Sequence, residues 1–505
     1  MVRDVWKIFL AILLLAAPLG TMAQEPLART EEKTGEPAGS VPKEESSVTE
    51  HTLRIGNQTI PYRATAGTIL LKNPKGEPTA LVFSTSYART DVTALDKRPL
   101  VFLFNGGPGA SSIWLHMGVF GPRRVVTRDA DFTPPAPYEL VDNASTLLDT
   151  ADLVFVDPVG TGFSHAVGKS QNKDFYGVDP DVQSLGQFVS TYVSRNNRWN
   201  SPKFLIGESY GTFRAAVLGN YLQSEYGMYL NGVVLISSLW QFGSQGDLQY
   251  VSALPTFAAT AWYHRLLDHR PAELTPFLDQ VRRFAETEYA SALMKGSRLD
   301  TATRSELARK LSEYTGLSEA YLLKANLRVN SGQFFAELQR SRGLNTGRFD
   351  TRVSGLNQNL LGEYPSSDPS FDSVLGPFTA AFNAYVRTTL KFGQDMTYHT
   401  FSSGSDGGSW DFKHDGNSSP NAGKDLAEAI LANPLLQVQV ECGFYDLATP
   451  FFSAEYAVDH LDLPAPLRPN IHLDYYEAGH MMYLHPADLV KLKQNVGAFI
   501  ERAAH

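Results

Sequence analysis

The stretch FLIGESYGTFRAA, from Phe204 to Ala216, places Ser209 between two glycines directly after an apolar run. The apolar run predicts a buried strand, and residues 212–223 have the spacing of a helix. A Gly-x-Ser-x-Gly sequence between a strand and a helix is typical of a sharp turn that presents a nucleophilic serine. Gly207 and Gly211 allow the turn to be tight. We therefore predict that Ser209 is a catalytic nucleophile.

Strands and helices alternate on both sides of this turn. Apolar strand-like runs occur at residues 68–73, 79–88, 99–107, 151–162, 231–237, 435–443 and 470–479. Helical spacing occurs at 179–195 and at 486–501. This alternation predicts an α/β fold with a mostly parallel central sheet flanked by helices.

The sheet-forming pattern is interrupted between residues 240 and 424, where helical segments replace the apolar strands. We interpret this segment as a large, mainly helical cap insertion. The predicted core then has a first part, 51–239, and a second part, 425–505.

The N-terminus has the pattern of a secretory signal. Arg3 and Lys7 flank the start of an apolar run, and small residues follow up to Ala23. The alternative, a membrane anchor, needs a longer apolar run to cross a bilayer. We predict a signal peptide at 1–23 and, from its polar composition, a disordered leader at 24–50.

Composition restricts the compartment and the partners. The chain has 505 residues and a net charge of -9, which disfavours nucleic acid as a partner. Its single cysteine, Cys442, excludes an intrachain disulfide. An exported protein without disulfides suits a bacterial periplasm or bacterial secretion. The chain contains no H-E-x-x-H, paired-cysteine or dinucleotide-binding motif, so we predict no metal and no organic cofactor.

A nucleophilic serine needs a base, and the base needs an acid that orients it. On a strand–elbow–helix scaffold the chain order is serine, acid, histidine. Asp446 follows one apolar strand and His480 follows the next, at the sheet edge where such folds carry their sites. His485 is a competing histidine, but His480 comes directly after the strand and Gly479.

The same chemistry needs donors for a developing oxyanion. Residues 102–112, FLFNGGPGASS, end a strand with a glycine-rich turn upstream of the elbow. The backbone amide of Gly107 can face the substrate there, and Tyr210 after the nucleophile supplies a second amide. The alternative reading is an ordinary glycine-rich turn.

Together these motifs resemble the serine carboxypeptidase family, the S10-type α/β-hydrolases. The resemblance rests on NGGPGASS…GP at 105–122, GTGFSHA at 160–166, GESYGT at 207–212, GFYD at 443–446 and GHMMY at 479–483. It implies an α/β-hydrolase fold and an enzyme that acts on peptide C-termini. It also implies a triad and an oxyanion hole, formed here by Ser209, Asp446, His480, Gly107 and Tyr210.

The resemblance further implies that Asn105 and Glu208 hydrogen-bond the free carboxylate of a peptide C-terminus, with Glu208 protonated. The alternative is that Glu208 only caps the turn. Two positions depart from the family pattern. Ala110 stands where a cysteine is usual, and Val119 stands where the best-known members have a second glutamate that pairs with the first.

From the sequence we therefore predict an exported serine carboxypeptidase that removes C-terminal residues through an acyl-enzyme. Its substrates would be peptide or protein C-termini, with no nucleic-acid partner and no membrane contact after signal cleavage. Two alternatives stay open: an esterase or acyltransferase with the same triad, and an inactive hydrolase-like binding protein. Trp114, Trp240 and Trp410 are candidates for the walls of the substrate pocket.

Overall fold

The computed structural model describes residues 43–243, 245–402 and 409–504. The predicted signal and most of the predicted leader lie outside these residues. The leader prediction is wrong at its C-terminal end, because β1 (Ser46–Ile55) includes residues 46–50. This strand pairs along its whole length with β2 (Gln58–Lys72). Most of its side chains are exposed or half-buried, so its composition resembles that of an unfolded segment.

The described residues form one large sheet of ten strands in the order β1-β2-β3-β7-β4-β9-β10-β13-β14, with β8 paired to β3. The strands from β7 to β14 run parallel, whereas β1, β2, β3 and β7 pair antiparallel. The remaining bounds are β3 (Pro78–Arg89), β4 (Leu100–Phe104), β7 (Asp152–Val156), β8 (His165–Ala166), β9 (Lys203–Glu208), β10 (Gly232–Ile236), β13 (Gln437–Gly443) and β14 (Ile471–Tyr476). The predicted α/β fold with a mostly parallel sheet is confirmed.

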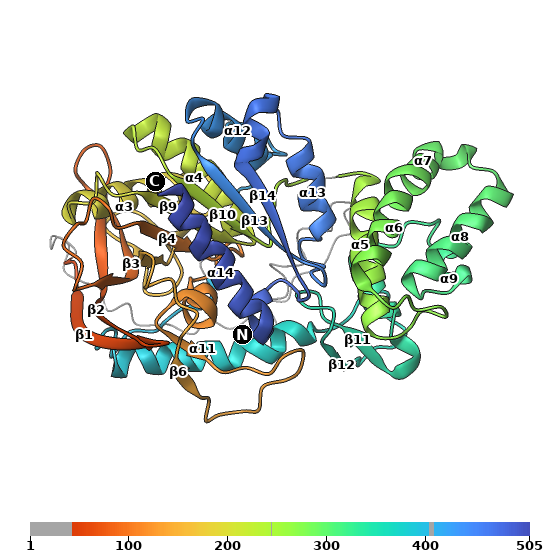
Figure 1. The fold of residues 1–505 in the computed structure, drawn as a ribbon, viewed down its shortest axis with the longest axis horizontal. Coiled ribbons are helices and arrows are strands. Elements are labelled where there is room, and N and C mark those ends of the chain that lie inside the picture. The colour runs from red at the N-terminus through yellow and green to blue at the C-terminus, as the bar shows by residue number, and fades with distance from the viewer. Residues whose placement is uncertain (1–42, 244, 403–408, 505) are drawn as a thin grey trace, which may run out of the picture.

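Helices cover both faces of this sheet (Figure 1). Successive residues of β4 bury into opposite hydrophobic clusters, Phe102 into one and Leu103 into the other. The first cluster includes residues of α3, α4 and α12, and the second includes residues of α11, α14 and the short π-helix η1. These helices are α3 (Val178–Arg195), α4 (Tyr210–Tyr226), α11 (Pro369–Thr388), α12 (Ala422–Ala432), α14 (Pro486–Ala503) and η1 (His116–Phe120). Burial on both faces explains why the central strands read as continuous apolar runs.

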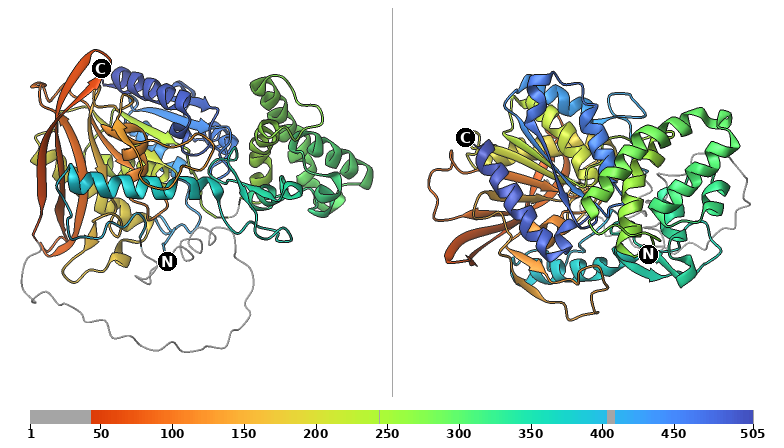
Figure 2. Two further views of the ribbon diagram at one scale, coloured as in Figure 1. Left: turned by 90° about the horizontal axis from the view of Figure 1, so that it is seen from below. Right: turned by 45° about the vertical axis from the view of Figure 1, so that its right-hand side comes forward.

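The segment between β10 and β13 contributes to two places in the molecule. Its first helices, α5 to α9, group at one side of the molecule (Figures 1 and 2), and α5 (Leu248–Tyr263) packs against α13 (Phe451–Asp459). The other bounds are α6 (Leu274–Phe284), α7 (Ala290–Lys295), α8 (Thr301–Thr315), α9 (Glu319–Lys324) and α10 (Ser331–Glu337). In contrast, α11 lies along the core, where Phe378 packs against Trp114. None of the helices in the described ranges is both long and apolar enough to cross a membrane.

A short hairpin lies between these two parts of the insertion. Its strands, β11 (Leu344–Thr346) and β12 (Ser354–Leu356), pair antiparallel. The loop between them, residues 347–353, reaches the carboxyl edge of the large sheet, where Thr351 N donates to Tyr445 O at 3.0 Å. The hairpin therefore connects the inserted segment to the edge at which the predicted site residues lie.

Candidate active site

The predicted site residues follow strands of the parallel part of the sheet. Asn105 comes directly after β4, Ser209 after β9, Asp446 shortly after β13 and His480 shortly after β14. The register pairs Phe104 with Gly207 and continues through β10 and β13 to β14. Parallel strands end at the same edge of a sheet, so the fold brings four distant segments to one place.

Ser209 has the strained backbone of a nucleophile elbow. Its φ is 61° and its ψ is -129°, a conformation that non-glycine residues rarely adopt. A Cβ atom at Gly207 would lie 2.0 Å from the carbonyl oxygen of Gly211, so no larger residue fits beneath the turn. Helix α4 begins at Tyr210, directly after the serine. The local sequence therefore sets the turn that presents Ser209.

The two predicted oxyanion donors come from adjacent loops. A Cβ atom at Gly106 would lie 2.4 Å from the backbone nitrogen of Tyr210, so the loop after β4 packs directly on the start of α4. Gly107 has a φ of 107°, which a side chain would make costly. The loop that carries Gly107 therefore lies against the first residue of α4.

His480 and Asp446 form a buried acid–base pair. His480 Nδ1 lies 2.7 Å from Asp446 Oδ2, and the two residues are 2 % and 0 % exposed. Asp446 also accepts from the amides of Ala448 and Thr449, at 2.8 and 3.0 Å, and from the Thr449 hydroxyl at 2.7 Å. These bonds fix the carboxylate and direct it to Nδ1 of the ring, which leaves Nε2 as the nitrogen for proton transfer.

The backbone of His480 is held on two sides. Its amide donates to the carbonyl of Phe349 at 2.6 Å, and its carbonyl accepts from the Ser237 hydroxyl at 2.7 Å. The Phe349 ring also packs edge-on against the imidazole, with 4.9 Å between ring centroids. Phe349 belongs to the hairpin loop 347–353, so the inserted segment helps to place the histidine.

Asn105 and Glu208 lie next to each other in the interior. Asn105 Nδ2 donates to Glu208 Oε1 at 2.9 Å, and the side-chain oxygen of Asn105 accepts from Leu115 N at 3.0 Å. Burial raises the pKa of Glu208 to about 7, although nearby His480 and Tyr483 oppose the shift. The carboxyl of Glu208 is therefore protonated over the acidic range, where it is a hydrogen-bond donor.

Three buried polar atoms near Glu208 make no hydrogen bond within the described residues. They are Oε2 of Glu208 itself, the Tyr483 hydroxyl and Nε2 of His480. The Glu208 carboxyl feels the charge of His480 and a hydrogen-bonding contribution from the Tyr483 hydroxyl, although that pair falls short of a full hydrogen bond, so the three side chains lie together. Unpaired buried polar groups are costly and are rare outside functional sites, so this group is suited to receive a polar ligand. Tyr483 ends the GHMMY motif, but only the folded structure shows that its side chain lies beside Glu208.

Arg214 is a second residue without a role in the sequence analysis. It is fully buried, pairs with Asp181 at 2.6 Å and donates to the carbonyl of Asn105 at 2.5 Å. It therefore anchors the backbone of the loop that carries Asn105 and Gly107. Only the tertiary structure reveals this contact, because Arg214 on α4 appears in the sequence as one polar residue of a helix.

A cavity of about 930 Å³ opens beside Ser209. Its walls include Gly107, Ser209 and Trp240, together with residues from α5, α12 and α13. Of the three candidate tryptophans, Trp240 lines this cavity, whereas Trp114 packs in the core and Trp410 packs on Tyr210. Asn105 and Glu208 do not line it. The cavity therefore extends from Ser209 on a side that does not include the Asn105–Glu208 pair.

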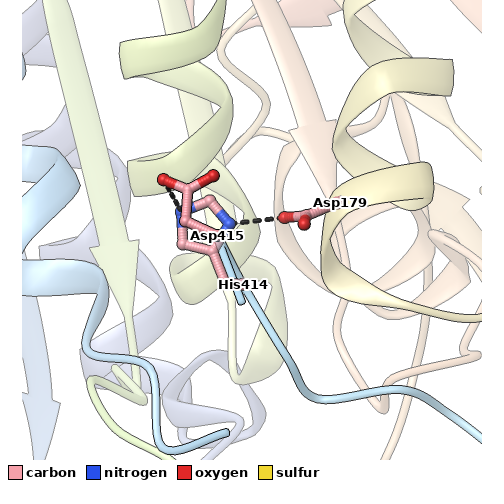
Figure 3. A group of neighbouring side chains, drawn as sticks. All are labelled: Asp179, His414 and Asp415. Carbon is pink, nitrogen blue, oxygen red and sulfur yellow. Dashed lines mark hydrogen bonds and ion pairs between the residues drawn. The ribbon is translucent and has the colours of Figure 1, made fainter. Parts of the chain in front are cut away.

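A separate group of ionisable residues surrounds His414 (Figure 3). Its Nδ1 lies 2.5 Å from Asp179 and its Nε2 lies 3.2 Å from Asp425, with Asp415 at 3.8 Å. Asp179, His414 and Asp415 are close enough to share a metal ion. However, hydrogen bonds to Asp425 and Asp179 raise the pKa of His414 to about 9. A protonated histidine donates from both nitrogens and offers no lone pair, so this group is an ion-pair cluster at neutral pH.

Comparison with known proteins agrees with this geometry. A family model described as serine carboxypeptidase, Peptidase S10, matches residues 79–480. Serine carboxypeptidase-like 50 of Arabidopsis thaliana is 29% identical over 253 residues, which are 49% of this chain and 52% of that protein. The human retinoid-inducible serine carboxypeptidase is 33% identical over 136 residues, 26% of this chain and 27% of the relative. The chain spans about half the length, or less, of these relatives.

The fold has a counterpart among solved structures. The crystal structure of Kex1(delta)p, a prohormone-processing carboxypeptidase from Saccharomyces cerevisiae, superposes with a TM-score of 0.53 at 17% identity. The alignment covers 88% of this chain and 92% of that one. The family model spans most of the chain, from β3 to the histidine of the acid–base pair, and so the chain belongs to the serine carboxypeptidase family.

Proposed function

We propose that this protein is a serine carboxypeptidase that removes single residues from the C-termini of peptides. The observation that carries the proposal is the buried Asn105–Glu208 pair. Glu208 directly precedes Ser209 in the chain, and Asn105 is hydrogen-bonded to Glu208. A protonated carboxyl and an amide are donors suited to a carboxylate, and Glu208 Oε2 has no partner among the described residues. A free peptide C-terminus supplies such a carboxylate next to the bond to be cut.

In this mechanism Ser209 Oγ attacks the carbonyl carbon of the last peptide bond while His480 Nε2 takes the hydroxyl proton. The backbone amides of Gly107 and Tyr210 stabilise the oxyanion. The intermediate collapses, the C–N bond breaks, and His480 returns the proton to the departing amine. Water then attacks the acyl-enzyme by the same route and releases the shortened peptide. Asp446 keeps the imidazole in the required tautomer throughout.

The Tyr483 hydroxyl is the third group that we place at the carboxylate site. Position 119, where the family pattern has a second glutamate, is a fully buried valine in η1. The tyrosine is buried beside Glu208 and has an unpaired hydroxyl among the described residues. Val119 leaves Glu208 without a second acid to share its proton, so burial, with a smaller contribution from the charge of Asp446, holds its pKa high.

The same sequence features support an exported bacterial enzyme. The N-terminal pattern predicts a cleaved signal, and the single cysteine is buried and unpaired. We propose a periplasmic or secreted location and a reaction that uses no metal or organic cofactor. Detection of the mature N-terminus after Ala23 by mass spectrometry would support export, and an intact N-terminus would contradict it.

An esterase or acyltransferase with the same triad is the second candidate. Val119 favours it, because a carboxylate site with one acid fewer selects less strongly for a free C-terminus. A binding protein without activity is disfavoured by the buried His480–Asp446 pair and by the strained Ser209.

The deciding experiment compares three substrates with one acyl part: an N-blocked dipeptide, its amide and the corresponding methyl ester. A carboxypeptidase hydrolyses the free dipeptide far faster than its amide and releases residues one at a time from longer peptides. A preference for the ester with slow dipeptide hydrolysis would favour the second candidate. Labelling of Ser209 by a fluorophosphonate tests whether the nucleophile is activated, and an unlabelled protein without turnover would support the binding protein.

A further inference from the structure

Arg348 is a cation beside the active site that has no part in the proposed catalytic mechanism or the carboxylate site. Its side chain lines the 930 Å³ cavity together with Ser209 and Gly107. Within the described residues its guanidinium makes no ion pair within 4.0 Å and no side-chain hydrogen bond. The guanidinium lies over the ring of Phe349, 5.3 Å from its centroid, a contact that uses none of its N–H donors. An arginine carries five donors and a permanent charge, so a half-buried guanidinium whose N–H groups make no hydrogen bond is suited to receive an anion.

The backbone of Arg348 holds it next to the catalytic residues. Its amide donates to Asp368 Oδ1 at 3.0 Å, and its carbonyl accepts from Leu447 N, also at 3.0 Å. Leu447 directly follows Asp446, and the next hairpin residue, Phe349, holds the backbone of His480. The backbone of Arg348 is therefore held next to the loop that carries Asp446.

The acids around Arg348 already have partners of their own. Asp446 is held by His480 and by Thr449, and Asp368 accepts from Ser370 Oγ at 2.6 Å. The other cation in the cavity wall, Lys424, is paired with Glu428 at 3.8 Å. Burial lowers the pKa of the Arg348 guanidinium, and the charges of Asp368 and Asp446 oppose the shift. Among the described cavity residues, Arg348 is thus the cation left for a ligand.

The place of Arg348 indicates which part of a substrate it meets. Asn105 and Glu208, which we assign to the terminal carboxylate, do not line the cavity that contains Arg348. The leaving residue must lie toward Glu208 and His480, so the cavity holds the acyl part of the substrate. From this geometry, and resting on the proposed function, we propose that Arg348 selects substrates with an acidic side chain on the penultimate residue, whose carbonyl Ser209 attacks.

The test uses two N-blocked dipeptides that differ by one isosteric change, Glu-Leu and Gln-Leu, and the methyl esters of N-blocked Glu and Gln. The quantity measured is the ratio of kcat/KM for the Glu substrate to that for the Gln substrate. We expect a ratio of about ten or more, typical of a charge-assisted hydrogen bond, for dipeptides and esters alike. Because the ester pair shares the acyl part, it tests Arg348 even if no dipeptide is cleaved, which would count against the proposed function alone.

The variants separate specificity from structure. Arg348→Met should bring the ratio close to one with little change for the Gln substrate, Arg348→Lys should keep part of the preference, and Arg348→Glu should favour a Lys substrate. Lys424→Met is the matched control, a cavity cation with its own partner, and should keep the wild-type ratio. The wild-type ratio should also fall below about pH 4, where the substrate carboxylate becomes protonated.

Three results would overturn the proposal. A wild-type ratio near one for both substrate pairs would show that the cavity does not distinguish an acidic side chain. If Arg348→Met lowers kcat/KM equally for Glu-Leu and Gln-Leu but not for the esters, Arg348 binds the terminal carboxylate instead. An equal loss for all four substrates, in a protein with an unchanged melting temperature, would assign it to placement of the Asp446 loop.

Discussion

The backbone amide of His480 donates to the carbonyl oxygen of Phe349 at 2.6 Å. The histidine belongs to the second part of the core, whereas Phe349 belongs to the segment inserted between β10 and β13. The same hairpin loop also bonds to Leu447 and Tyr445, on either side of Asp446. The position of His480, the predicted catalytic base, thus depends on the inserted segment as well as on the sheet.

This dependence makes Gly479 a sensitive position. A Cβ atom there would lie 2.3 Å from the Phe349 carbonyl oxygen and 2.6 Å from Asp350 Cα. We expect Gly479→Ala to push the hairpin away from His480, to lower kcat by at least tenfold and to destabilise the fold by about 1–3 kcal/mol. Gly219→Ala is the control, since its added methyl group meets only Leu230 at 3.4 Å. Equal kinetics in both variants would refute the role of the Phe349 contact.

Asp446 is predicted to act through the imidazole. Asp446→Asn keeps the shape of the side chain but lets an amide face Nδ1, which favours the wrong tautomer. We expect kcat to fall by roughly 10⁴-fold with little change in KM. Ser209→Ala and His480→Ala should give losses of similar or greater size without loss of fold. If Asp446→Asn retains wild-type turnover, another acid such as Asp474 or Glu477 must orient the histidine.

Glu208 should determine how KM depends on pH. Its raised pKa of about 7 keeps the carboxyl protonated below neutrality, where it donates to the substrate carboxylate. Above that pH it ionises and repels the substrate, so KM for dipeptides should rise. Glu208→Gln is a donor at every pH and should give a flat KM profile from pH 5 to about pH 9. As a control, KM for an ester should not rise with pH in either protein. If KM for dipeptides rises in parallel with pH in the wild type and in Glu208→Gln, Glu208 does not contact the carboxylate.

Val119→Glu tests whether a second acid extends this range. Two close carboxyls share a proton and hold it to higher pH, so KM for dipeptides should begin to rise at a higher pH than in the wild type. Val119 is fully buried, so the variant should also melt at a lower temperature. Val119→Gln has a similar shape but cannot ionise, and its KM profile should match the wild type. If the plots of KM against pH for Val119→Glu and the wild type are superimposable, position 119 does not act on Glu208.

His414 should contribute a pH-dependent part of the folding stability. Its folded pKa, about 9, lies above its ordinary value, so the contribution is complete below about pH 6.5 and is lost as the pH rises through 9. His414→Gln should therefore lower the melting temperature clearly at pH 6 and much less at pH 10. The exposed His269 makes no ion pair with any of the described residues, and His269→Gln serves as the control. If the difference in melting temperature between His414→Gln and the wild type stays constant from pH 6 to pH 10, His414 is not charged in the folded protein.

Local sequence patterns are sufficient to predict several elements of this protein. The strand, turn and helix around Ser209, the glycine-rich turn after β4, and the strand ends before Asp446 and His480 are each encoded within a few residues. The expected helix at 179–195 is observed as α3 (Val178–Arg195). Periodicity and turn chemistry act over short distances, so such elements can be predicted without knowledge of their neighbours.

Only the tertiary structure decided the contacts between distant segments. Arg214 reaches the Asn105 carbonyl, Tyr483 lies beside Glu208, and Arg348 stands next to the loop of Asp446. The first strand was missed for the same reason, because its stability comes from pairing with β2 rather than from its own composition. Burial and pairing with distant segments are properties of the folded surroundings, so local sequence patterns could not single out Arg214, Tyr483 or Arg348.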